Sequence, residues 1–180
     1  MDKKISIFEV GPRDGLQNIK NEIPTNKKIE LINILSATGI KKIECGSFVS
    51  AKWVPQMKGT DQIFQKISRK DGVKYTALTP NLKGFENAVN AQVDEIAVFA
   101  AASETFSQKN VNCSIEESLE RFQDIFKQAK RKKMPVRGYV SCIVECPYEG
   151  KVMPDKVLEV TSRLLDMGCY EVSLGDTIGK

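Results

Sequence analysis

Short apolar runs alternate along the whole chain with longer segments in which apolar side chains recur every three or four residues. The first pattern is typical of strands buried on both faces, and the second is typical of helices that bury one face. The apolar runs predict strands over residues 5–10, 42–46, 73–79, 94–101, 136–144 and 170–174. The periodic segments predict a helix that ends before Gly39 and helices over 61–68, 84–91, 114–129 and 154–168.

One of these helices carries clear signals at both ends. Ser114 followed by Glu117 is a capping box, which satisfies the first backbone N–H groups of a helix. The basic run over residues 130–133 closes the same helix just before Pro135, where cations complement the helix dipole. We therefore interpret this run as a solvated helix end, in preference to a nucleic-acid patch.

Strands that alternate with helices indicate parallel strands joined by right-handed crossovers, so the fold class is α/β. A doubly wound nucleotide-binding sheet needs a G-x-G-x-x-G turn after its first strand, and the segment 11–15 does not have that spacing. The final segment, 175–180, is one residue short of a phosphate-binding loop and lacks its Ser or Thr. A TIM (β/α)8 barrel fits better, although eight units need about 250 residues. We therefore predict one partial TIM-barrel domain over residues 1–180, an incomplete barrel with about the first six β/α units.

Composition restricts the class of protein further. The chain has 180 residues, of which 41% are hydrophobic and 28% are charged, as in globular proteins. The longest uncharged apolar stretch, 96–103, is far shorter than the roughly 20 residues that span a bilayer, so we expect no membrane association. A net charge of +4 is too balanced for a nucleic-acid-binding surface. The first residues lead straight into an apolar segment without a targeting leader, which predicts a cytoplasmic location.

Cysteine and histidine usage excludes several kinds of site. The chain has no histidine, which rules out a Ser-His-Asp triad, a Cys-His pair and a histidine-ligated metal within it. Its cysteines are odd in number and lack a C-x-x-C pair, so we expect reduced, buried thiols and no disulfide framework. Cys142 and Cys146 have a C-x-x-x-C spacing that is too loose to indicate a metal site.

Candidate chemistry lies where the predicted strands end, because barrel active sites form at the carboxyl ends of the strands. Arg13 and Asp14 follow the first strand, Glu44 lies near the end of the second and Asp176 follows the sixth. We expect these side chains to converge at one mouth. The Asp14 carboxylate can ligate a hard divalent cation, and the Arg13 guanidinium can stabilise a developing enolate or carboxylate. Glu44, inside an apolar segment, is a candidate for a raised pKa or for holding Arg13 in place.

Each candidate also has a purely structural interpretation. Arg-Asp-Gly after a strand is common in solvated turns. Glu44 can be a structural ion-pair partner, and Asp176 with Thr177 can cap a following helix. Acids and a guanidinium at three equivalent strand ends favour the functional interpretation.

The segment Gly11-Pro12-Arg13-Asp14-Gly15-Leu16-Gln17-Asn18 resembles the first-strand motif of metal-dependent barrel lyases and acyl-transferring synthases. Longer segments narrow this resemblance to the hydroxymethylglutaryl-CoA lyase family. They lie at 47–50, 52–57, 78–86, 100–104, 112–118, 137–142, 146–151 and 167–179 and cover essentially the whole chain.

The resemblance implies cleavage of 3-hydroxy-3-methylglutaryl-CoA, a CoA thioester, to acetyl-CoA and acetoacetate, with Mg²⁺ or Mn²⁺, as in leucine degradation and ketone-body formation. It also implies a homo-oligomer, a dimer in the family. By resemblance, Asp14 is a metal ligand, Arg13 stabilises the enolate oxygen, and Glu44 and Asp176 support the reacting groups and the metal shell. Weaker assignments are Gln17, Ser47 and Ser173 in the substrate pocket and Lys109 and Asn110 at coenzyme A.

The family pattern continues beyond Lys180. A His-x-His pair on strand seven, an asparagine metal ligand and a cysteine acid in a later loop belong to that region in the family. With strands seven and eight and the C-terminal region absent, the resemblance implies an N-terminal portion that is a truncated, inactive form by itself. Two alternatives remain: a related condensing synthase of the isopropylmalate or homocitrate type, and a non-catalytic remnant that binds a full-length subunit.

Overall fold

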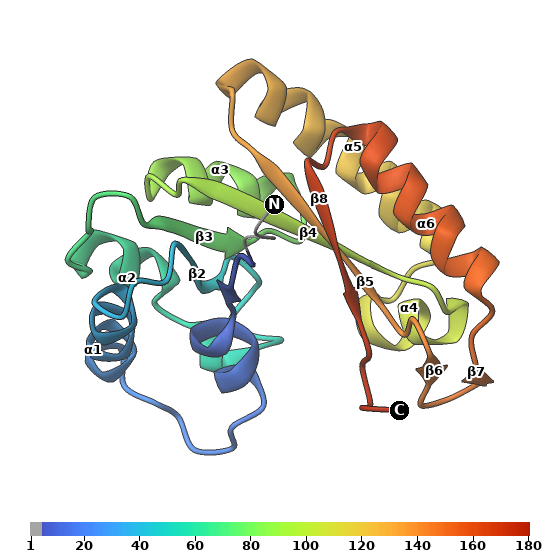
Figure 1. Cartoon of the computed structure of the whole chain (residues 1–180), viewed down its shortest axis with the longest axis horizontal. Coiled ribbons are helices and arrows are strands. Elements are labelled where there is room, and N and C mark those ends of the chain that lie inside the picture. The colour runs from blue at the N-terminus through green and yellow to red at the C-terminus, as the bar shows by residue number, and fades with distance from the viewer. Residues whose placement is uncertain (1–4) are drawn as a thin grey trace. The chain divides into compact units, whose positions relative to one another are not determined.

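The computed structural model describes residues 5–180. Strands and helices alternate along the chain, which divides into two compact units, one up to Ile96 and one from Ala97 onward (Figure 1).

The first unit contains three neighbouring parallel strands in chain order. Helices α1 and α2 pack against the middle strand, β2 (Figure 1). The buried side chains of Ile32, Ile43, Ile63, Tyr75 and Phe85 form its core. Its elements are β1 (Phe8–Glu9), the π-helix η1 (Gly11–Gly15), α1 (Thr25–Ser36), β2 (Lys42–Ser47), η2 (Pro55–Met57), α2 (Thr60–Lys66), β3 (Lys74–Leu78) and α3 (Leu82–Asn90).

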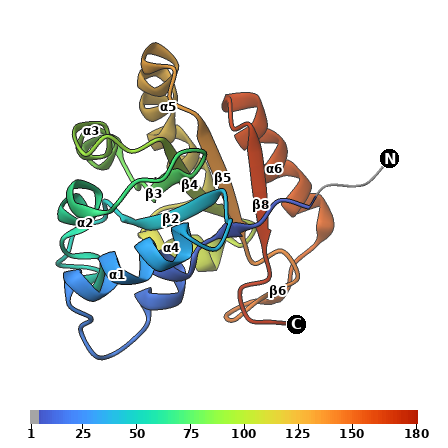
Figure 2. The same ribbon diagram turned by 60° about the vertical axis from the view of Figure 1, so that its left-hand side comes forward.

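Strand β4 (Glu95–Ala101) begins in the first unit and continues into the second. In the second unit, β5 and β8 are parallel, and α6 packs against both (Figure 2). Besides β4, the elements of the second unit are α4 (Glu104–Val111), α5 (Ile115–Lys132), β5 (Val136–Ser141), β6 (Glu145–Cys146), β7 (Gly150–Lys151), α6 (Pro154–Met167) and β8 (Glu171–Gly175).

The end signals of α5 are confirmed. The Ser114 hydroxyl accepts a hydrogen bond from the Glu117 amide at 3.1 Å, and the Glu117 carboxylate accepts one from the Ser114 amide at 2.8 Å. The basic residues lie in the last turn of this helix, as the helix-end interpretation requires. The α/β class, with parallel strands that alternate with helices, is confirmed as well.

Two predicted strands are shorter than expected. The first strand was predicted over 5–10, but Ile5 and Ile7 are 89% and 62% exposed, and the ladder with β2 consists of Phe8 and Glu9. The fifth was predicted over 136–144 and ends at Ser141, because Cys142 adopts a left-handed backbone conformation with φ of 61°.

The elements that the sequence analysis missed include helix α4 and the antiparallel β6–β7 hairpin. Helix α4 has a weak apolar stripe and begins at a capping residue, Ser103, whose hydroxyl accepts a hydrogen bond from the Phe106 amide at 3.0 Å. The hairpin strands have two residues each, too few for any alternation to be recognised.

The described residues also bear on the expectations about membrane-spanning helices and cysteines. Over residues 5–180, no helix combines the length and the apolar character that crossing a bilayer requires. All five cysteines are buried, as we predicted for small apolar side chains, and over the same residues they are free thiols.

Close packing between β2 and α2 provides a test of the fold. A Cβ atom on Gly46 would lie 2.7 Å from Thr60 Oγ1, and that hydroxyl is held near the carbonyl oxygens of Ser47 and Met57. We expect Gly46→Ala to lower the free energy of unfolding by about 1–3 kcal/mol. In the control Gly15→Ala, the added Cβ meets no atom within 4 Å, and the change stays within about 0.5 kcal/mol. Urea denaturation followed by circular dichroism measures both, and equal effects would contradict the packing argument.

Candidate active site

The turn after β1 positions the first two candidate residues. The carbonyl oxygen of Val10 accepts hydrogen bonds from the amides of Arg13 at 3.1 Å, Asp14 at 2.7 Å and Gly15 at 3.4 Å. This is the π-helix η1, a rare conformation that is frequent at functional sites. The Glu9 carboxylate fixes the start of the turn by accepting a hydrogen bond from the Gly11 amide at 2.6 Å.

A buried ion pair joins this turn to strand β2. Arg13 Nε lies 2.5 Å from Glu44 Oε1, Arg13 is 8% exposed and Glu44 is fully buried. A charge that is removed from water needs a partner, so each of these groups makes the other tolerable. This contact agrees with the interpretation that Glu44 holds Arg13 in place, a role that stays a prediction.

Asp14 contacts the same guanidinium from the solvent side. Arg13 Nη1 donates to Asp14 Oδ1 at 2.7 Å, and the Asp14 side chain is 61% exposed. Arg13 therefore connects a buried carboxylate to an accessible one. The site therefore has a guanidinium, which can bind an anionic group of a substrate, and beside it an exposed carboxylate, which can ligate a metal ion.

A β-bulge follows Glu44. In the pairing of β2 with β3, Glu44 is opposite Thr76 and Gly46 is opposite Ala77, so Cys45 is the extra residue. Thr76 shares the face of Glu44, is completely buried, and its hydroxyl has no hydrogen-bond partner within the described chain. The sequence analysis missed Thr76, because a threonine in an apolar strand carries no signal of this kind.

Gln56 is a second residue that the sequence analysis missed. Its side-chain amide donates to the carbonyl oxygens of Ile19 and Asn21 and accepts from the Ile23 amide, each at 3.0 Å. These contacts fix the loop that follows η1 and Gln17, so Gln56 supports the segment next to Asp14. Only the spatial contact reveals this role, since the partners lie more than 30 positions away in the sequence.

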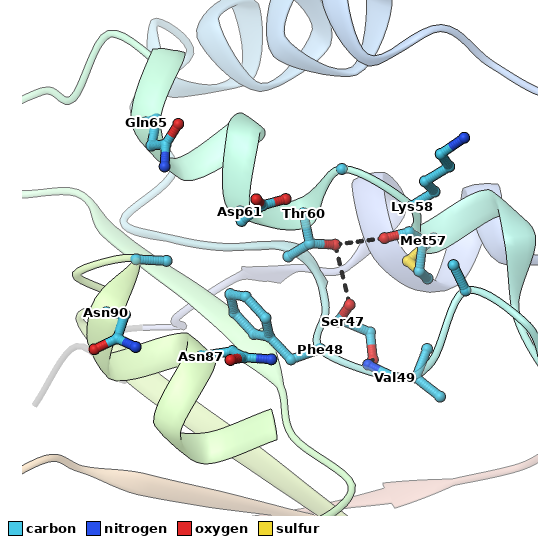
Figure 3. A pocket seen from close by; sticks show the side chains of 13 residues that line it. Ser47, Phe48, Val49, Met57, Lys58, Thr60, Asp61, Gln65, Asn87 and Asn90 are labelled. Carbon is cyan, nitrogen blue, oxygen red and sulfur yellow. Dashed lines mark hydrogen bonds between the residues drawn. The ribbon is translucent and has the colours of Figure 1, made fainter. Parts of the chain in front are cut away.

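Ser47 lies at a cavity of about 410 Å³ between α2 and α3, with Phe48 projecting into it (Figure 3). The Ser47 hydroxyl is buried and interacts with the backbone, donating to the Leu78 carbonyl at 3.4 Å and accepting from the Val49 amide at 3.3 Å. The lining that the structure describes for this cavity does not include Arg13, Asp14 or Glu44. Gln17 is half-buried directly after η1.

The remaining predicted residues lie in the second unit. Ser173 is half-buried on β8, and Asp176 is exposed after it, where its carboxylate accepts a hydrogen bond from the Gly179 amide at 3.1 Å and so stabilises a turn. Lys109 and Asn110 are exposed near the end of α4, and Lys109 Nζ lies 4.9 Å from the centre of the Tyr148 ring. The structure thus brings Arg13, Asp14 and Glu44 together, while the convergence of Asp176 with them stays a prediction.

Few side chains of the described residues are arranged so that they could ligate a metal ion. Over residues 5–180 there is no cluster of three or more His, Cys, Asp or Glu side chains that could hold a metal ion. Asp14 offers one accessible carboxylate, which by itself cannot fix the geometry of a divalent cation.

Comparison with known proteins identifies the family. A family model described as HMGL-like matches residues 4–180. The chain belongs to the HMGL-like family. The cytoplasmic 3-hydroxy-3-methylglutaryl-CoA lyase of Mus musculus is 60% identical to this HMGL-like chain over 97% of its length, and the mitochondrial lyase of Bos taurus is 58% identical over 98%. The chain covers 51% and 54% of those two proteins, about half the length of the curated relatives it matches.

Solved structures confirm the barrel-family fold of this HMGL-like chain. The hydroxymethylglutaryl-CoA lyase of Pseudomonas aeruginosa matches 98% of the chain with a TM-score of 0.95 and 58% identity, and the match covers 59% of that lyase. A second lyase structure, in complex with coenzyme A and 3-methylmalate, matches 97% of the chain with a TM-score of 0.92 and 37% identity, over 57% of its own length. The predicted resemblance to the N-terminal portion of such lyases, with an incomplete set of barrel units, is confirmed.

The buried pair generates a stability prediction. Arg13→Ala leaves the Glu44 carboxylate buried without its guanidinium, and we expect the free energy of unfolding to fall by about 3–5 kcal/mol. Adding Glu44→Leu removes the uncompensated charge and recovers a large part of that loss. Lys83→Ala, which breaks an exposed pair with Glu86, is the surface control and changes stability by less than about 1 kcal/mol. If Arg13→Ala behaves like the surface control in urea denaturation, the pair is not structurally required.

Proposed function

We propose that this chain is the N-terminal part of a carbon–carbon lyase that cleaves 3-hydroxy-3-methylglutaryl-CoA to acetyl-CoA and acetoacetate. The observation that carries the proposal is the Arg13 guanidinium, held between buried Glu44 and exposed Asp14, in a chain whose relatives are named as lyases of this substrate. Those names favour the lyase over a condensing synthase.

The reaction makes two demands on the protein. The C3 hydroxyl of the substrate must lose a proton, and the departing acetyl-CoA carbanion must be held as an enolate. A fixed guanidinium meets the second demand, because a donor that is already aimed at the developing charge lowers the barrier without reorganising. Glu44 acts through Arg13: it holds the guanidinium in one orientation by accepting a hydrogen bond from Nε, and is therefore a positioning residue.

A divalent cation, Mg²⁺ or Mn²⁺, would polarise the oxygens of the substrate. Asp14 is the residue of this chain that we assign to it, because its carboxylate is exposed beside Arg13. Asp14 supplies one ligand, and the cation would need further oxygen ligands to define its geometry, so we derive no step of the reaction through the metal.

The other assignments complete the proposal. Asp176 supports the reacting groups, Gln17, Ser47 and Ser173 contribute to the substrate pocket, and Lys109 and Asn110 contact coenzyme A. A solved relative with bound coenzyme A supports a CoA thioester as the substrate. We further propose a homo-oligomer, a cytoplasmic location and a role in leucine degradation.

The proposal is tested with this chain alone and with a fusion to the C-terminal part of the Pseudomonas aeruginosa lyase. We expect acetoacetate release from the fusion with Mg²⁺ or Mn²⁺ and none from residues 1–180 alone. In the fusion, Arg13→Gln lowers kcat at least about a hundredfold, equivalent to about 3 kcal/mol in the barrier, and changes KM little.

Arg163→Gln on the surface of α6 is the matched control and keeps full turnover. A fusion that binds the substrate but never cleaves it would overturn the proposed function. Near-normal kcat with a raised KM in Arg13→Gln would overturn the role of Arg13.

A second prediction concerns Asp14. Asp14→Asn in the fusion keeps the side-chain shape but removes the charge, and we expect the Mn²⁺ concentration for half-maximal activity to rise at least about tenfold. Asp166→Asn, at an exposed position of α6, is the control, and equal metal dependence in both variants would contradict the assignment of Asp14.

A further inference from the structure

The β6–β7 hairpin is held against the start of helix α4 by several side chains. The Ser103 hydroxyl, which caps α4, donates to Cys146 Sγ at 3.0 Å. The rings of Phe106 on α4 and Tyr148 on the hairpin have centres 6.3 Å apart. The hairpin thus places Cys146 Sγ within hydrogen-bond distance of Ser103, the residue that caps the N-terminus of α4.

Cys146 is surrounded by hydrogen-bond donors, although it is only 1% exposed. The amide of Tyr148 donates to its sulfur at 3.4 Å, in addition to the Ser103 hydroxyl at 3.0 Å. Burial acts to raise the pKa of this thiol, but the hydrogen bonds from Ser103 and from the Tyr148 and Glu149 amides outweigh it, and the net pKa is lowered. The environment therefore stabilises a thiolate, the reactive form of cysteine.

Cys142 is the second thiol of the cluster. Its side chain interacts with that of Cys146, and burial is the main reason that its pKa is raised to about 11. Its left-handed backbone turns the chain at the end of β5, and its amide donates to Thr177 Oγ1 at 2.8 Å. A thiol whose pKa is lowered thus interacts with a second thiol whose pKa is raised, which is the arrangement of an attacking and a resolving cysteine.

We propose that Cys142 and Cys146 form a reversible intramolecular disulfide when a low-molecular-weight disulfide acts as the oxidant. The Cys146 thiolate attacks one sulfur of the oxidant, whose sulfur–sulfur bond breaks and releases one thiolate. Cys142 then loses its proton and attacks Cys146 in the mixed disulfide, which expels the second small thiol. Two protein thiols are oxidised, one small disulfide is reduced to two thiols, and the released thiolates take up the protons.

Access to the buried sulfur requires the hairpin to move. Each hairpin strand has only two residues, so the hairpin is expected to open locally at a small free-energy cost compared with unfolding of the core. The disulfide would change the contacts of Cys142 with Thr177, which adjoins Asp176. The inference does not depend on the proposed function, because it concerns thiol chemistry alone.

The test exposes the intact 180-residue chain to oxidised glutathione and locates the products by peptide mass mapping. We expect loss of two of the five thiols, a disulfide between Cys142 and Cys146, and recovery of both thiols with dithiothreitol. In Cys142→Ser, a glutathione mixed disulfide accumulates at Cys146 at least about tenfold faster than at Cys45, Cys113 or Cys169. Cys146→Ser forms neither product, and Cys169→Ser, at another buried thiol, still forms the disulfide.

As a control for the role of the fold, the chain is unfolded with guanidinium chloride before oxidation. We expect the preferential oxidation of Cys142 and Cys146 to disappear in the unfolded chain. Trapping of glutathione at Cys142 instead of Cys146, oxidation that links other cysteines, or equal reaction of all five thiols in the folded chain would each overturn the proposal.

Discussion

A buried guanidinium and a buried carboxylate are tolerated in a protein interior only as a close pair. Arg13 and Glu44 are such a pair, and they connect the turn after β1 to the middle of β2. The π-helix η1, the bulge at Cys45 and the close approach of α2 to Gly46 all lie within a few residues of this contact. The backbone is therefore irregular near the buried Arg13–Glu44 pair, and it is regular elsewhere in β2 and β3.

The features that were predicted from the sequence are those that depend on neighbouring residues or on a general rule of the fold. The capping box at Ser114 depends on one turn of chain, and it is present with both of its hydrogen bonds. The pairing of Arg13 with Glu44 followed from the rule that the carboxyl ends of neighbouring parallel strands meet, together with the family resemblance. The strands themselves follow from buried apolar runs.

The features that were missed depend on distant contacts. Gln56 and Thr76 are ordinary polar residues in the sequence, and their importance lies in partners, or in the lack of a partner, that only the folded chain defines. Helix α4 has little amphipathic character and is stabilised by Ser103 and by the β6–β7 hairpin. The hairpin in turn is too short to be recognised without its contacts to α4. Elements that stabilise one another in this way leave no separate signal in either segment.

The hydrogen bonds of Gln56 limit what can replace it. Its amide meets two carbonyl oxygens and one N–H group at once, so the position needs two donors and one acceptor on a side chain of this reach. Glutamate lacks the donors, asparagine is one methylene shorter, and lysine and arginine have no acceptor. Among the common side chains glutamine alone satisfies all three groups, so variation at this position is tolerated only where the loop after Asp14 changes with it.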